Sequence, residues 1–445
     1  MFANVLLLLC AYYFIKPLRE GWLAVSGIEG LTKMELKAYS SFGQAVLLVW
    51  VVSVYSRFVG RWPRHILIAR ATVFCMVVMV VFWAIQPDFL IVSLPYGGIV
   101  FYLWVGMFGV FVIAQFWAFA ADLFTDDRGR RLMPVIAIGA TSGAVVGSWI
   151  AKQTVSFGIL STEYLLLASL VPLALTVWLT KLAHEAESPR PAQASHAADD
   201  RIDHNPHSDS APAAASSPDT DTRGTVAIIF GSRILLALAV VTLLTNWVNT
   251  NGENILFRVI QESVEEDVHA RGIVDAKEVL RFVRDQTTAF YSDFFFWVNI
   301  LALFLQAVVA SRMLKYGGFG MIFLALPVIA LISYSVMVLV PVLLAIKVMM
   351  IAENATDYSL SNTARHVFWL PFDSASTYKG KPAVDSLFVR FGDGLAALTV
   401  LAGVQVLGLS LVGYLAFNFA LALAWLGLAI WLVIEHRRFR ESATQ

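Results

Sequence analysis

Lys16 and Arg19 are basic residues that flank Pro17 inside an otherwise apolar segment, residues 2–25. The apolar run before Lys16 is shorter than the about 20 helical residues that cross a bilayer, so a spanning helix must continue through these charges. Pro17 also leaves a backbone carbonyl that lipid cannot satisfy. Buried charge of this kind favours a wet cavity that binds an anion. The alternative is an interfacial anchor whose long side chains reach the headgroups.

Acidic residues occur in apolar segments of the second half of the chain. Glu353 and Asp357 are four residues apart, and Arg390 and Asp393 are three apart, so the members of each pair share a helix face. Two carboxylates on one face repel each other, which favours a proton held by one of them. Arg390 and Asp393 are spaced to form a salt bridge. The alternative is that these acids pair with intramembrane cations and hold the chain together.

These patterns predict two sets of site residues and no catalytic or metal-ligating residue. The chain contains no G-x-x-x-x-G-K and no H-E-x-x-H motif, so we expect neither an enzyme nor a cofactor. The predicted substrate-binding set is Lys16, Arg19, Asn249, Asn354 and Arg390. The predicted proton-coupling or gating set is Glu20, Glu253, Glu353, Asp357 and Asp393.

The composition indicates that membrane helices position these residues. Hydrophobic residues make up 58% of the 445 residues and charged residues 14%, which excludes an ordinary soluble globule. Acidic and basic residues balance at 32 each, so no nucleic-acid partner is implied. Cys10 and Cys75 lie in apolar segments and suggest neither a disulfide nor a metal site. Segment 2–25 lacks the basic start of a secretory signal, so we expect it to be retained.

Twelve hydrophobic segments of bilayer length predict an all-α integral membrane protein with two six-helix halves. The predicted domains are an N-terminal half 1–182, a disordered linker 183–225 and a C-terminal half 226–436, followed by a tail 437–445. The linker is rich in Ala, Ser, Pro, Asp and His and has almost no large apolar residue. The twelve segments are 2–25, 36–57, 65–86, 94–122, 132–153, 162–181, 228–256, 290–313, 319–340, 341–364, 384–408 and 411–434.

The distribution of basic residues predicts the orientation. Lys and Arg gather after segments 2, 4, 8 and 10 and at the chain end, which places both termini and the linker on the cytoplasmic side of a bacterial inner membrane. The charged segment 261–287 is then an external flap, and 276–283 within it has the pattern of an amphipathic surface helix. The inner cations are Arg57, Arg61, Arg64, Arg128, Arg130, Arg131, Arg312, Lys315, Lys379, Lys381, Arg437, Arg438 and Arg440.

Weak internal repetition relates the two halves. The first segment of each half is interrupted by polar residues, at 16–20 and at 246–254. Matching interruptions of this kind predict a binding site at the interface of the halves. The fifth segment carries Gly139, Gly143 and Gly147 at four-residue spacing, which favours close helix packing rather than chemistry.

Four motifs, at residues 12–20, 116–120, 357–360 and 378–385, together resemble the ATP/ADP translocases and their bacterial relatives in the major facilitator superfamily. The resemblance implies twelve helices and alternating access around a central cavity. Arg19 occupies the place of a first-helix basic residue that the family associates with nucleotide transport. Where nucleotide exchangers have Arg-x-Gly-Lys, this chain has Arg390, Phe391, Gly392 and Asp393.

Two classes of function follow. The first is a secondary transporter of an anionic or zwitterionic metabolite, with a nucleotide among the candidates, that works by exchange or with protons. Its partners would be this small molecule and the lipid bilayer, and we expect a monomer. The second is a non-transporting membrane sensor or scaffold subunit with a transporter-like fold.

Overall fold

The computed structural model describes residues 1–56, 64–86, 96–123, 126–157, 161–187, 229–372, 377 and 380–443. Across these ranges the chain is helical and contains no strand. Most of the predicted linker, 188–225, lies outside the described residues, as do Arg57, Arg61 and Lys379. The side chains of Arg64, Arg128, Arg130 and Arg131 are also outside the description.

The N-terminal half is a bundle of six long helices that follows the first six predicted segments. Helix α1 lies inside this bundle, in contact with α4, α5 and α6, and the ring centres of Trp22 of α1 and Phe101 of α4 are 4.3 Å apart. In keeping with this central position, α1 is buried along most of its length. The elements are α1 (Phe2–Val25), α2 (Lys33–Ser56), α3 (Arg64–Ala84), α4 (Gly97–Leu123), α5 (Asp126–Ser156), the short η1 (Thr162–Tyr164) and α6 (Leu165–Glu187).

The C-terminal half contains the remaining helices. The eighth predicted segment runs through α9, η2 and the start of α10, and Gly318, with φ of 65° and ψ of −164°, separates it from the ninth. The elements are α8 (Arg233–Arg271), α9 (Ala276–Phe304), η2 (Leu305–Val309), α10 (Ala310–Leu339), α11 (Leu343–Thr356), η3 (Asp357–Ser361), α12 (Asn362–Phe368), α13 (Lys381–Ala383), η5 (Val384–Phe388), α14 (Val389–Gln405) and α15 (Leu411–Ala443).

The helices agree with the predicted all-α membrane fold. Nine helical stretches of the described chain are long and apolar enough to cross a bilayer, and one of them, 276–339, contains two segments. Helix α2 and the joined α11, η3 and α12 account for the other two predicted segments. The elements η2, η3 and η5 are π-helical turns, which interrupt the regular hydrogen-bond ladder and often mark functional positions.

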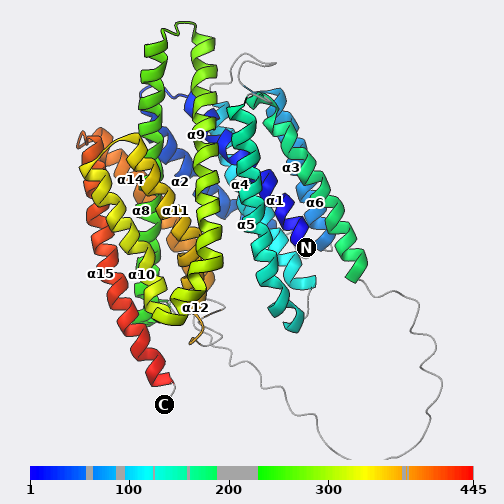
Figure 1. The fold of residues 1–445 in the computed structure, drawn as a ribbon, viewed down its shortest axis with the longest axis vertical. Helices are drawn as coiled ribbons and strands as arrows, with labels where there is room; N and C mark the ends of the chain where they lie inside the picture. The colour runs from blue at the N-terminus through cyan, green and yellow to red at the C-terminus, as the bar shows by residue number, and fades with distance from the viewer. Residues whose placement is uncertain are drawn as a thin grey trace, which may run out of the picture.

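Helices α8 and α9 continue beyond the predicted membrane segments as a helical hairpin, which projects at the top of Figure 1. Gly272, with φ of 66°, ends α8, and the Asp275 carboxylate caps α9 by accepting from the backbone N–H of Lys277 at 2.8 Å. Residues 261–287 are therefore the ends of two long helices and the turn between them, and the predicted surface helix 276–283 is the first part of α9. We call this end of the molecule the hairpin end.

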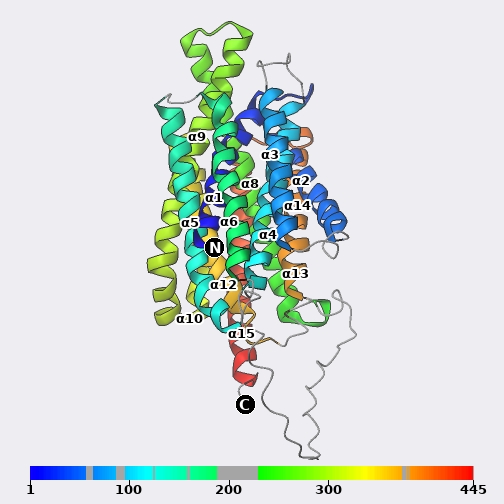
Figure 2. The same cartoon turned by 90° about the vertical axis from the view of Figure 1, so that its right-hand side faces the viewer.

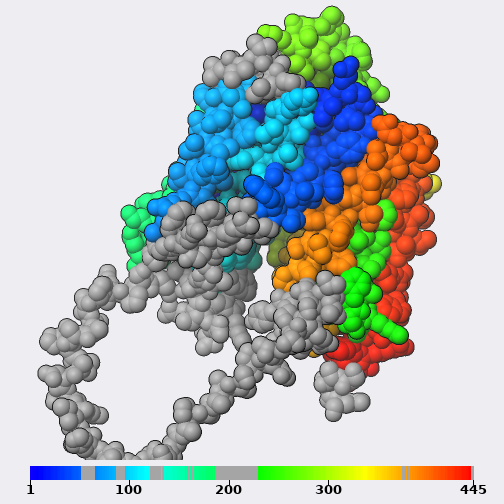
Figure 3. All heavy atoms as spheres, turned by 180° about the vertical axis from the view of Figure 1, so that it is seen from behind, coloured from blue at the N-terminus to red at the C-terminus, as the bar shows by residue number. Residues whose placement is uncertain are grey.

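The two halves lie side by side in Figure 1, with α1, α2 and α5 of the first half against α8, α9 and α14 of the second. Figure 2 is seen from the side of the first half, which lies in front of the second. In Figure 3, α2 lies directly against α14 toward the hairpin end. Polar contacts join the halves there: Gln405 donates to Glu35 at 2.7 Å, and Thr162 donates to Asp285 at 2.6 Å. These contacts hold the two halves together at the hairpin end.

Candidate functional site

Four ionisable side chains meet where α1 crosses the start of α2. Arg19 donates to Glu20 Oε1 from Nη2 at 2.6 Å and from Nε at 3.0 Å, while Lys37 donates to Glu20 Oε2. All three side chains are buried, and so is Lys16, one helical turn away from Glu20. Glu20 is therefore held by two cations, and Arg19 is already ion-paired.

Aromatic rings complete the surroundings of these cations. The Arg19 guanidinium lies 4.4 Å from the ring centre of Tyr102 on α4, and the Lys37 ammonium lies 5.0 Å from the same ring. Lys37 also lies 5.4 Å from the ring centre of Phe257 on α8 and 5.9 Å from that of Tyr291 on α9. Ring faces attract cations most strongly when water is excluded. Rings from both halves therefore stabilise this cluster.

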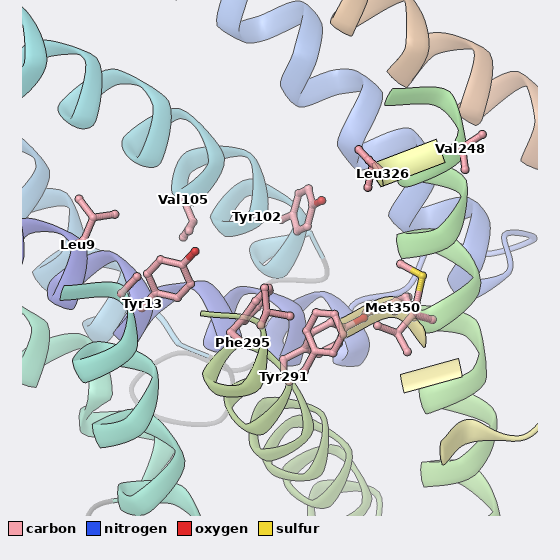
Figure 4. Packing of buried hydrophobic residues seen from close by; sticks show 14 of the residues in the cluster. Leu9, Tyr13, Tyr102, Val105, Val248, Tyr291, Phe295, Leu326 and Met350 are labelled. Carbon is pink, nitrogen blue, oxygen red and sulfur yellow. The ribbon is translucent and has the colours of Figure 1, made fainter. Parts of the chain in front are cut away.

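Lys16 differs from its neighbours, because it forms no ion pair with any described residue. Its ammonium donates to the Tyr358 hydroxyl at 3.3 Å and lies 4.1 Å from the ring centre of Phe295. Both partners belong to the C-terminal half, so Lys16 lies at the interface between the halves. Figure 4 shows Tyr13 of α1 beside Phe295 of α9, with Tyr291 beyond Phe295, and the ring centres of Tyr13 and Phe295 are 6.0 Å apart.

Glu253 on α8 is the acidic residue that faces this cluster from the second half. It interacts electrostatically with Lys16 and Lys37, yet it forms no hydrogen bond or ion pair with the described residues. With Lys16, Arg19 and Lys37 charged against Glu20 and Glu253, the cluster carries a formal charge of +1. An added anion would balance this charge.

Arg390 and Asp393 form the predicted salt bridge on α14, with Nη1 and Oδ2 2.9 Å apart. The other oxygen, Oδ1, accepts from Asn246 at 2.7 Å and from Thr250 at 3.0 Å, both on α8. The two oxygens of Asp393 thus accept three hydrogen bonds, one from Arg390 and two from α8. The arrangement ties α14 to α8 within one half.

Glu353 and Asp357 have different surroundings although they are one helical turn apart. Asp357 lies at the start of the π-turn η3 and accepts from Arg365 at 3.0 Å. Glu353 is 2% exposed, and its Oε2 has no hydrogen-bond partner. No described cation pairs with it. A buried carboxylate without a cation is costly, whereas the protonated acid is tolerated.

The other two predicted binding residues are less engaged with the cluster. Asn354 is buried and donates to the carbonyl of Met350 in its own helix at 2.9 Å. Asn249 is partly exposed, and its side-chain oxygen has no partner.

The structure therefore brings Lys16, Arg19, Glu20 and Glu253 together, and it pairs Arg390 with Asp393 on α14. Glu353 lies one turn from Asp357 and interacts electrostatically with Glu253. The sequence interpretation missed Lys37, Tyr102 and Phe295. Lys37 is the second residue of the predicted segment 36–57, so its position inside a spanning helix was the available signal. Tyr102 and Phe295 lie in aromatic-rich segments where nothing in the sequence distinguishes them.

The arrangement of helices can now be compared with known proteins. No protein-family model matches the chain, and no curated protein matches it. Solved structures are similar over nearly the whole chain. The chain has the major facilitator fold. A peptide transporter of the POT type in complex with sulfate is 12% identical, with a TM-score of 0.63, covering 99% of this chain and 94% of that one.

Two further solved structures have the same fold. A D-xylose–proton symporter is 12% identical, with a TM-score of 0.59, covering 98% of this chain and 96% of that one. The nucleoside transporter NupG is 13% identical, with a TM-score of 0.54, covering 98% of each chain. At these identities the likeness shows the fold, with its multiple membrane-spanning helices.

Proposed function

We propose that the protein is a secondary transporter that moves an anionic metabolite by alternating access. The observation that carries this proposal is Lys16, a buried ammonium at the interface of the halves without a carboxylate partner among the described residues. Such a charge is expensive inside a membrane and normally serves a substrate path. The transporters with the same fold, which include a sugar–proton symporter and a nucleoside transporter, support the class of function.

The substrate would bind between the halves, because Lys16 contacts Tyr358 and Phe295 of the opposite half. A ligand held by both halves has a different affinity for each conformation, and this difference drives alternating access. Arg19 and Lys37 would act mainly by holding Glu20, so that the cluster keeps its formal charge of +1. This charge favours an anion over a neutral sugar.

Among anions, the resemblance to the ATP/ADP translocases favours a phosphorylated metabolite, with a nucleotide as the first candidate. Asp393 stands where nucleotide exchangers have a lysine, and it is paired with Arg390. This position therefore adds no positive charge to the cavity. We infer a substrate with fewer negative charges than ATP.

The proposed proton carrier is Glu353. Of the five predicted acids, Glu20, Asp357 and Asp393 have ion pairs, and Glu253 faces two lysines. Glu353 alone among these five is buried with an unpartnered oxygen and no nearby cation partner in the described chain. Its geometry supports a group that is protonated in this conformation and releases the proton in another.

Uptake into proteoliposomes tests the proposal. We expect the purified protein to accumulate at least one compound from a panel of nucleotides and other phosphorylated or carboxylated metabolites. Lys16→Gln should weaken substrate affinity about ten-fold or more, the effect of losing one charged contact, while the melting temperature changes little. The control is Lys181→Gln, which alters a solvent-exposed lysine on α6. A sensor or scaffold would show no uptake of any compound.

A further inference from the structure

A groove of about 610 Å³ lies between α9 and α11, away from the cluster around Lys16. Its walls are apolar except at one end. Trp297, Phe304 and Leu344 are 48%, 54% and 71% exposed, so in a membrane these side chains contact lipid. The lining residues are Asp293, Trp297, Ile300, Leu301, Phe304, Leu344, Lys347, Val348 and Ile351.

The polar end of this groove is a triad of charges. The Asp293 carboxylate accepts from Lys347 on α11 and from Lys152 on α5, each at 2.6 Å. Two ammonium groups share one carboxylate, so the triad carries a formal charge of +1. The three side chains are 21–26% exposed, which leaves them within reach of a ligand. Each ammonium has three donor hydrogens and uses only one on Asp293.

The dimensions of the groove match one leaflet of a bilayer. Asp293 and Phe304 are eleven residues apart on α9, which corresponds to about 16 Å along a helix. The hydrocarbon core is about 30 Å thick, so the groove extends from the edge of the core to near its centre. The charged triad lies toward the hairpin end of α9, where the predicted membrane segment 290–313 begins.

We propose that this groove binds one anionic phospholipid, with the phosphate at Lys152 and Lys347 and one acyl chain along the apolar wall between α9 and α11. The positive triad selects an anionic headgroup over a zwitterionic one. The apolar wall provides contacts that a free phosphate ion would not make.

The site also spans the two halves, because Lys152 belongs to α5 whereas Asp293 and Lys347 belong to the second half. A headgroup bound to both lysines would stabilise the packing of α5 against α9. This inference is independent of the transported substrate, since neither lysine contacts the proposed substrate cluster.

Trp297 provides the readout for the test. The protein is placed in phosphatidylcholine nanodiscs with a fixed minor fraction of either brominated phosphatidylglycerol or brominated phosphatidylcholine, since bromine quenches tryptophan on contact. The contribution of Trp297 is the difference between wild type and Trp297→Phe. Trp178 on α6 is 57% exposed, lies outside the groove and gives a matched control through Trp178→Phe.

We expect Trp297 to be quenched about five-fold more by the brominated phosphatidylglycerol than by the brominated phosphatidylcholine. One lysine contact with an anionic headgroup strengthens binding by about this factor. Trp178 should be quenched equally by both lipids. Lys347→Gln should abolish the preference at Trp297. Because that variant leaves Asp293 with one partner and could misfold, Asp293→Asn is the second variant. It raises the local charge to +2, so the preference should persist or increase. Equal quenching of Trp297 by the two lipids in the wild type would overturn the proposal.

Discussion

Gly21 on α1 packs directly against Thr288 on α9, across the interface of the two halves. A Cβ atom at Gly21 would lie 2.1 Å from Thr288 Oγ1 and 2.7 Å from the carbonyl oxygen of Arg284. The Thr288 hydroxyl cannot turn away freely, because it donates to that same carbonyl at 2.7 Å. Only glycine therefore permits this approach of α1 to α9, and the contact lies toward the hairpin end.

Gly21→Ala should weaken the closure of the hairpin end. Overpacking of this kind costs about 1–3 kcal/mol, which raises the fraction of open molecules about five-fold or more. The measurement is the rate at which a membrane-impermeant maleimide modifies a cysteine at Met34, in a chain whose Cys10 and Cys75 are replaced by alanine. Met34 is buried beside α8 residues at this end.

The control for this experiment is Gly27→Ala, because no atom lies within 4 Å of a Cβ at Gly27. It should leave the labelling rate unchanged. If Gly21→Ala lowers the melting temperature and the labelling rate still equals that of wild type, the glycine serves packing and has no part in opening.

Arg19→Gln should reduce thermal stability more than Lys16→Gln does. Both cations lie over aromatic rings, but Arg19 makes two hydrogen bonds to the charged Glu20, whereas Lys16 makes one, to a neutral hydroxyl. Loss of a charged hydrogen bond costs about 1.5–3 kcal/mol. Chemical or thermal unfolding of the two variants in the same detergent checks the order. The opposite order, with Arg19→Gln mainly reducing affinity, would return Arg19 to the substrate-binding set.

The contact between Glu35 and Gln405 should make stability depend on pH at the acid end. Glu35 lies in the first turn of α2, outside the predicted membrane segment. Burial alone would raise the pKa of Glu35, but hydrogen bonds from Gln405, Thr32 and Tyr39 outweigh it and hold the pKa below the ordinary value of 4.5. A carboxyl with a depressed folded-state pKa stabilises the fold above its unfolded pKa, and this contribution is lost as pH falls through the folded value.

Glu35→Gln is the corresponding variant. The wild type should be the more stable protein at pH 7, and the difference in melting temperature should shrink as pH falls below about 4.5. Gln405→Ala should show the same trend, because it removes one of the donors. A difference that stays constant between pH 3 and pH 7 would show that Glu35 acts through packing rather than through its charge.

The fold could be predicted from the sequence because bilayer thickness fixes the length of apolar segments. Every predicted segment has a corresponding helix or set of joined helical elements in the structure. The helical hairpin was harder to predict from the sequence, because helix α8 continues to Arg271 through charged residues that give no signal of a membrane helix. The interpretation of 261–287 as a flap therefore missed that α8 and α9 each extend without a break from a membrane segment into this region.

The sequence identified several charged residues of the site, but it did not show which of them form ion pairs with each other. Intramembrane charge marked Lys16, Arg19 and Glu20 from the sequence alone. The partner of Glu20, Lys37, is 17 residues away and comes from another helix, so helical spacing gave no information about the pair. The same holds for Asp293, whose partners Lys152 and Lys347 lie 141 and 54 residues away. Tertiary packing decides which charges remain without a partner.

Glu353 is the residue on which proton coupling depends in our proposal. If it is protonated in this conformation, Glu353→Gln replaces one neutral group by another of similar shape, and stability should change little. Asp393→Asn is the matched contrast. It leaves Arg390 without its carboxylate partner. Breaking a mostly buried ion pair in this way should lower the free energy of unfolding by about 3–5 kcal/mol. Unfolding measurements on both variants at pH 7 check this difference.

Transport assays then separate coupling from binding. Glu353→Gln should abolish pH-dependent accumulation of substrate and spare counterflow, because counterflow requires no net proton movement. Asp357→Asn, which alters a paired acid one turn away, should retain the pH dependence. If Glu353→Gln keeps the wild-type pH profile of accumulation, the carrier must be sought at Glu253, whose carboxylate also has no ion pair with the described residues, or the protein is an uncoupled exchanger.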